Sequence, residues 1–145
     1  MFRILIEIDR ESVIEAGVSG LRKAVVFMYQ WLTDEQEALG YILGFLHLMT
    51  GFVLSLLVVL SHIFPNIWFQ LGVFLCVFAV WIQHILLNVC ISIVAEESMT
   101  DAIAPFHKMM EEIVGVSVHE CNMYTTYAEP AIVACLFLEL LARIF

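Results

Sequence analysis

The stretch that decides the fold covers residues 38–95 and reads ALGYILGFLHLMTGFVLSLLVVLSHIFPNIWFQLGVFLCVFAVWIQHILLNVCISIVA. It is almost wholly apolar and contains no Asp, Glu, Lys or Arg. A membrane-spanning helix needs about 20 predominantly apolar residues, and only helices and closed barrels satisfy their backbone in lipid. The stretch therefore predicts two spanning helices, residues 40–64 and 67–95, joined at the Pro65-Asn66 turn.

The composition of the whole chain agrees with this prediction. Its 145 residues are 62% hydrophobic, and the mean hydropathy is +0.95, which is typical of membrane proteins. The formal net charge is −9, and the acidic residues lie in the two segments that flank the hairpin. Binding of nucleic acid requires a Lys/Arg footprint, so the composition excludes nucleic acid as a partner.

The four cysteines match no metal-binding or redox motif, and the N-terminus has no secretory signal. No C-x-x-C occurs, which leaves a zinc or thioredoxin-type interpretation without support, and we expect four free thiols. The first nine residues lack the apolar core of a secretory signal. The first span is therefore expected to act as an uncleaved signal-anchor.

The segment before the hairpin, residues 1–39, predicts an amphipathic helix over residues 11–32. Ser12 and Glu15 form a capping-box pattern at its start. The helix either packs on the bundle, which we favour, or lies in the headgroup plane with its aromatic residues at the interface.

Two further segments follow the hairpin. Residues 96–129 form an acidic, Met-rich connector in which Ser98 or Thr100 caps a short helix that Gly115 ends. Residues 130–145 predict a third apolar helix of about 24 Å. We expect it to be a third span, tilted or begun at Tyr124; a half-span or an element docked in protein is the alternative.

One stripe of the first span carries small and polar residues that predict close helix packing. Its members lie at steps of four or three residues: Gly40, Gly44, His47, Gly51 and Ser55. On the second span, His84 and Asn88 lie near one helical face. We expect all seven residues to be helix-packing positions.

His47 and His84 lie about 18 residues before and after the turn, at matching depth in an antiparallel hairpin. We favour interhelical hydrogen bonds of the two rings with Asn88, Gln83 or each other. The less favoured alternatives are a haem or metal site and a proton relay. We therefore expect no cofactor and no metal, since further ligands for zinc are lacking.

No catalytic motif was found, and the sequence predicts a protein that is not an enzyme. The connector also contains His107, Glu111, Glu112, His119 and Glu120, which could resemble a metal cluster. His119-Glu120 lacks the second histidine four residues later that a metalloprotease helix has, and we expect the glutamates to form a solvated face instead. Arg22, Lys23 and Lys108 would place both polar segments in the cytosol under the positive-inside rule.

Three short runs resemble a pattern in small uncharacterised multi-span membrane proteins, including some of large double-stranded DNA viruses. They are Trp81-Ile82-Gln83-His84, Asn88-Val89-Cys90-Ile91 and Glu96-Glu97. The resemblance implies a structural protein of a virion's internal membrane that links lipid to the capsid. It implies no catalytic residues.

The predicted fold is all-α, a membrane-embedded helical bundle. The predicted function is structural: a scaffolding protein in the lipid bilayer, of a virion or of a host endomembrane, that contacts other membrane or capsid proteins and forms a possible homo-oligomer. The alternative is a small oligomeric ion or proton channel with a polar path through His47, His84, Asn88 and Glu139.

Overall fold

The computed structural model describes residues 9–100 and 103–145, and every element among them is a helix. The all-α prediction is confirmed. The elements are, in chain order, α1 (Arg10–Tyr29), α2 (Gln36–Ile63), α3 (Ile67–Leu87), α4 (Ile91–Thr100), α5 (Pro105–Met109), the π-helix η1 (Met110–Val114), α6 (Val118–Met123), the π-helix η2 (Tyr124–Ala128) and α7 (Glu129–Ile144).

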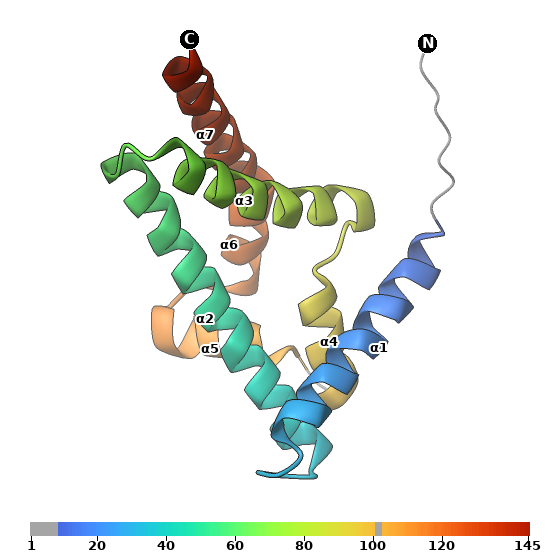
Figure 1. The fold of residues 1–145 in the computed structure, drawn as a ribbon. Coiled ribbons are helices and arrows are strands. Elements are labelled where there is room, and N and C mark those ends of the chain that lie inside the picture. Colours follow the sequence, from blue (N-terminus) through green and yellow to red (C-terminus); the bar gives the residue numbers. More distant parts are fainter. Residues whose placement is uncertain (1–8, 101–102) are drawn as a thin grey trace.

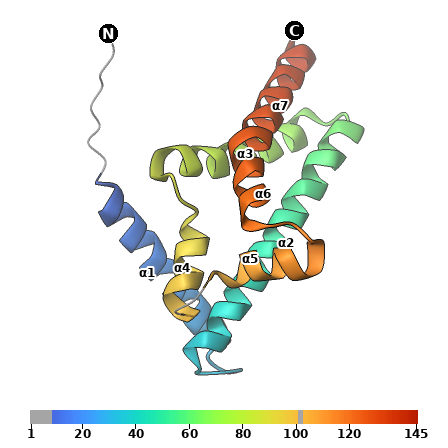
Figure 2. The ribbon, with the colours of Figure 1, turned by 180° about the vertical axis from the view of Figure 1, so that it is seen from behind.

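Helix α2 is the axis on which two groups of helices pack (Figures 1 and 2). Helices α1, α4 and α5 lie beside its N-terminal half, around a core of Val25, Leu39, Leu43, Ala95 and Met99. Helices α3 and α7 lie at its C-terminal half, around a second core of Val73, Val77, Val133 and Leu136.

Both α2 and α3 are long and apolar enough to span a membrane. Only 11% of the most apolar window of α2 and 22% of that of α3 are buried within the chain. The core helix of a soluble protein would bury most of such a window. The apolar faces of these two helices are therefore available to lipid or to another chain.

The turn between α2 and α3 forms as predicted, but the hairpin is open. Asn66 caps α3 by accepting hydrogen bonds from the backbone N–H groups of Trp68 and Phe69. From this turn α3 leads away from α2 (Figures 1 and 2). Helix α7 packs along α3, and its Ile132, Val133 and Leu136 fill part of the second core.

The second apolar run, residues 67–95, does not form one helix, so that prediction was wrong. Helix α3 ends at Leu87, and Asn88 follows in the left-handed conformation with φ of 58°. Asparagine tolerates this conformation better than other residues with a side chain. The remainder of the run starts α4, which packs against the N-terminal half of α2.

Helix α1 packs on α2 and α4 through Val25, Val18 and Leu21, in line with the favoured interpretation. Its cap is Asp9, which accepts from the N–H of Ser12, so the predicted Ser12 cap was wrong. Phe27 lies on the opposite face and is exposed. Residues 1–8, where we found no signal sequence, lie outside the described residues.

The connector differs from the prediction at its start and agrees at its end. Ser98 and Thr100 belong to α4, and α5 instead begins with Pro105 in its first turn. Gly115 ends η1 with φ of +75°. The next helix begins at a capping box of Ser117 and Glu120, in which hydrogen bonds from Ser117 lower the pKa of the Glu120 carboxyl.

The last helix is longer than residues 130–145. Helices α6, η2 and α7 follow one another without a break from Val118 to Ile144 (Figure 2). Insertion of a π-helical turn keeps the axis continuous. This is the extended form of the third helix that a start near Tyr124 allows.

The small-residue stripe of α2 is a packing face over half of its length. A Cβ atom on Gly40 would lie 2.6 Å from Thr100 Cγ2, and one on Gly44 would lie 2.7 Å from Pro105 Cβ. A Cβ on Gly51 meets nothing within 4 Å. Ser55 is exposed and donates to the Gly51 carbonyl oxygen of its own helix. The close approach is thus made by Gly40 and Gly44 with α4 and α5.

We predict that Gly44→Leu lowers the free energy of unfolding by about 2 kcal/mol, because its side chain must displace the α5 backbone. Gly51→Leu is the matched control on the same helix and should leave stability unchanged or raised. Thermal unfolding of both variants in mild detergent measures the difference. Equal melting temperatures would contradict the packing described.

Candidate histidine–cysteine site

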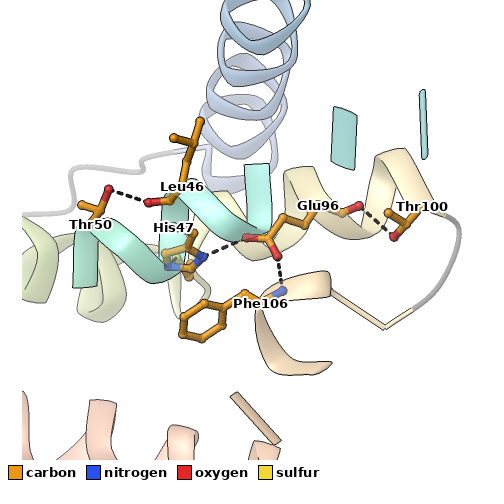
Figure 3. A network of polar contacts seen from close by, with 7 residues as sticks. Leu46, His47, Thr50, Glu96, Thr100 and Phe106 are labelled. Atoms are coloured by element: carbon orange, nitrogen blue, oxygen red, sulfur yellow. Dashed lines mark hydrogen bonds and ion pairs between the residues drawn. The ribbon is translucent and has the colours of Figure 1, made fainter. Parts of the chain in front are cut away.

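A buried carboxylate joins α2, α4 and α5. Glu96 of α4 is 0% exposed. Its Oε1 lies 2.8 Å from His47 Nδ1 of α2, and its Oε2 accepts from the backbone N–H of Phe106 in α5 at 2.7 Å (Figure 3). Both oxygens are therefore hydrogen-bonded, which a buried charge requires.

The His47 ring is held on a second side by an aromatic ring. The Phe106 ring stacks on it with centroids 4.2 Å apart and an interplanar angle of 23°. Because the Glu96 carboxylate accepts at Nδ1, the proton of the neutral imidazole lies on Nδ1, and Nε2 has a free lone pair. That Nε2 lies 3.7 Å from Cys90 Sγ.

Cys90 lies in the linker between α3 and α4, outside both candidate spans. Its carbonyl oxygen accepts from the N–H of Val94 and so starts the α4 hydrogen-bond ladder. Burial raises the pKa of the Cys90 thiol, but hydrogen bonds with the His47 and His84 rings and with the Ile93 backbone outweigh burial and lower the pKa to about 5. Thiols at helix N-termini beside histidine commonly ionise in this way.

A second histidine–carboxylate pair lies on the other side of the sulfur. His84 Nδ1, on the last turn of α3, lies 2.8 Å from Glu129 Oε2 in the first turn of α7. The ring also lies close enough to Cys90 to help lower the pKa of its thiol. The thiol therefore lies between two imidazoles, each oriented by its own glutamate.

A third pair closes the far end of α2. His62 Nε2 lies 3.2 Å from Glu139 Oε1, and Gln70 Nε2 donates to Glu139 Oε2 at 2.7 Å. Arg143, four residues after Glu139 on α7, could pair with it by spacing but instead donates to the carbonyl oxygen of Phe64 at 3.4 Å. Gln70 is fully buried, and its Oε1 has no hydrogen-bond partner.

The sequence predicted that His47 and His84 could meet. The structure brings both rings to one site, where their partners are glutamates and Cys90. Each ring bonds with a glutamate, and the His47 ring also with Cys90, rather than with Asn88, whose side chain is exposed where α3 ends. Sequence reasoning missed Cys90, Glu96 and Glu129. Asn88 is the sequence signal that could have identified the first two. A helix that ends at Asn88 turns Cys90 and Glu96 back into the bundle.

The histidines and glutamates of the connector do not form one cluster. His107 is buried next to Phe106, whereas Glu111, Glu112, His119 and Glu120 are exposed. Among residues 9–100 and 103–145, no group of three or more His, Cys, Asp or Glu residues is arranged to hold a metal ion. The three pairs of histidine and glutamate are thus the polar clusters available for chemistry in the described part of the chain.

Comparisons with known proteins add no family to these observations. No family model matches the chain, and neither a curated protein nor a solved structure is detectably similar to it. The site is therefore interpreted from its own geometry.

We predict that Glu96→Ala lowers the free energy of unfolding by about 3 kcal/mol, because it leaves the His47 ring and the Phe106 N–H without their buried acceptor. The neighbouring Glu97 is exposed, and Glu97→Ala should change stability by less than about 0.5 kcal/mol. Unfolding of the two variants in the same detergent measures the contrast. Similar losses in both would show that the buried pair does not stabilise the fold.

Proposed function

We propose that the protein is a multi-span membrane protein with a structural, scaffolding role. The observation that carries the proposal is the exposure of the two longest and most apolar helices, α2 and α3. Large side chains such as Phe52, Leu56 and Leu75 are half-exposed or more on these helices. Burying such surface in lipid or in another subunit removes it from water, which is favourable.

The cationic residues support one orientation of α2. Arg22 and Lys23 lie on α1, which packs beside the N-terminal half of α2. Lys108 lies over the ring of Tyr41, 5.9 Å from its centroid, at the same end. By the positive-inside rule, this end of α2 faces the cytosol.

The surface offered to a partner protein is acidic. Glu111 and Glu112 of η1 are exposed, as is Glu120 of α6. None of the three takes part in a salt bridge within residues 9–100 and 103–145. Their partner is expected to be a protein with a basic surface; a capsid protein of a virion with an internal membrane is the partner that the viral resemblance suggests.

The test is a charge reversal in the native membrane. Glu111→Lys together with Glu112→Lys should remove the partner from the complex seen by native mass spectrometry, since like charges at an interface repel. Glu11→Lys together with Glu15→Lys, also exposed but on α1, is the matched control and should retain the partner. All variants should stay in the membrane pellet after alkaline carbonate extraction.

Two results would contradict the proposal. Release of the wild-type protein by carbonate would exclude spanning helices. A wild-type protein that stays in the membrane, but carries no partner under any mild extraction, would exclude the scaffolding role.

A second candidate function is a small oligomeric proton channel or transporter. The observation that favours it is the set of three histidine–glutamate pairs, each with its histidine on α2 or α3. Ionisable groups within spanning segments commonly mark proton paths. Three spans are few for a pore in one subunit, so this function requires a homo-oligomer.

For this candidate, His84→Ala should abolish a pH-dependent proton flux into liposomes that contain the purified protein. His119→Ala, which changes an exposed histidine of α6, should leave the flux unchanged. The flux is measured with a pH-sensitive dye trapped in the liposomes. No flux in the wild type, or equal flux in both variants, would exclude the channel.

A further inference from the structure

The thiol of Cys90 is a half-buried nucleophile that the scaffolding role does not use. It is also the one cysteine with a hydrogen bond to a histidine in the described part of the chain. Cys76 and Cys135 are exposed on α3 and α7 and are free. The environment of Cys90 thus differs from that of Cys76 and Cys135, so an experiment can distinguish the reactivity of Cys90 from theirs.

The arrangement around Cys90 is that of an activated nucleophile. Its Sγ lies 3.7 Å from His47 Nε2, and His47 Nδ1 lies 2.8 Å from the fully buried Glu96 carboxylate. A nucleophile, a base within reach and a third group that orients the base are the parts of a Cys–His–acid triad. Phe106 fixes both Glu96 and His47, since its N–H donates to Glu96 and its ring stacks on His47.

Two other features suit a reaction at this sulfur. Cys90 precedes the first turn of α4, whose N–H groups lack helical carbonyl partners and carry a partial positive charge. Negative charge that develops beside the sulfur would be stabilised there. Ile85 and Leu86, on the last turn of the candidate span α3, are 52% and 44% exposed, which provides an apolar surface close to the thiol along the chain.

We propose that Cys90 accepts a long-chain acyl group from an acyl thioester, with His47 as the residue that holds the thiol proton and Glu96 as the positioning residue. A thiolate reacts readily with the carbonyl carbon of a thioester. A thioester that carries a long acyl chain is the electrophile expected at the lipid boundary of a spanning helix. This inference does not rest on the scaffolding role, because it concerns a covalent modification of the chain itself.

The step balances as a transthioesterification. His47 Nε2 holds the proton that the Cys90 thiol has given up, and the Cys90 thiolate attacks the carbonyl carbon of the donor. The bond between that carbon and the donor sulfur then breaks, and the leaving thiolate takes the proton back from His47. The products are an acyl-Cys90 thioester and the free donor thiol, and nothing is oxidised or reduced.

The experiment uses the full chain, purified in mild detergent and incubated with palmitoyl-coenzyme A. One palmitoyl group should be found on Cys90 by peptide mass spectrometry, and neutral hydroxylamine should remove it, as it does thioesters. Cys90→Ser should abolish the modification. Cys76→Ser and Cys135→Ser should retain it.

The roles of His47 and Glu96 are measured in the same assay. His47→Gln should slow acylation at pH 7 by about 30-fold, because a thiol with an ordinary pKa near 8.5 keeps its proton there, and Glu96→Gln should slow it less. Acylation of Cys76 and Cys135 at the rate of Cys90, or equal rates in wild type and His47→Gln, would overturn the proposal. So would no acylation at all.

A second measurement on the wild type keeps the test independent of how the variants fold. Iodoacetamide labels thiolates, and the ratio of Cys90 to Cys135 labelling should be large at pH 6 and fall as the pH rises, because an ordinary thiol ionises only near pH 8.5. The groups that face the sulfur are His47 and His84, each paired with a glutamate. Preferential alkylation without acylation would show a reactive thiol with a different substrate and would reject the acyl donor.

Discussion

The hydrogen-bonded Glu96 carboxylate is the interaction on which the rest of the structure depends. Removing a charge from water is costly, so its two oxygens must find donors wherever the chain buries it. One donor is His47 of α2 and the other is the backbone of α5. The pairing also requires Gly44, since a Cβ there would lie 3.1 Å from Glu96 Oε2. One carboxylate thus fixes the register of three helices.

The left-handed residue Asn88 makes this pairing possible. If residues 67–95 formed one straight helix, Glu96 would lie at its far end, about 45 Å from Asn66 at 1.5 Å per residue. The break after Leu87 turns α4 back against α2 instead. The same break leaves Cys90 at the start of a helix and between two imidazoles. The reactive environment of the thiol therefore follows from the change of chain direction.

Sequence reasoning predicted the features that depend on local composition. The apolar character of α2 and α3, the Pro65-Asn66 turn and the stop at Gly115 follow from hydropathy and turn chemistry, and the structure contains them. The partners of His47 and His84 did not follow, because an antiparallel hairpin was assumed and Asn88 was assigned a polar contact rather than a helix end. The contacts that matter here join residues more than 40 positions apart, and no local pattern specifies them.

The three histidine–glutamate pairs share one asymmetry. Every histidine lies on a candidate span, whereas Glu96, Glu129 and Glu139 all come from the chain after α3. The apolar stretch has no acid of its own, so it takes its hydrogen-bond acceptors from the C-terminal third of the protein. That third is acidic for two separate reasons. Some of its carboxylates hold α4 and α7 against α2 and α3, and others, such as Glu111 and Glu112, remain exposed. The net charge of the chain therefore overstates the acidity of its surface, because the paired glutamates are committed to holding the helices together.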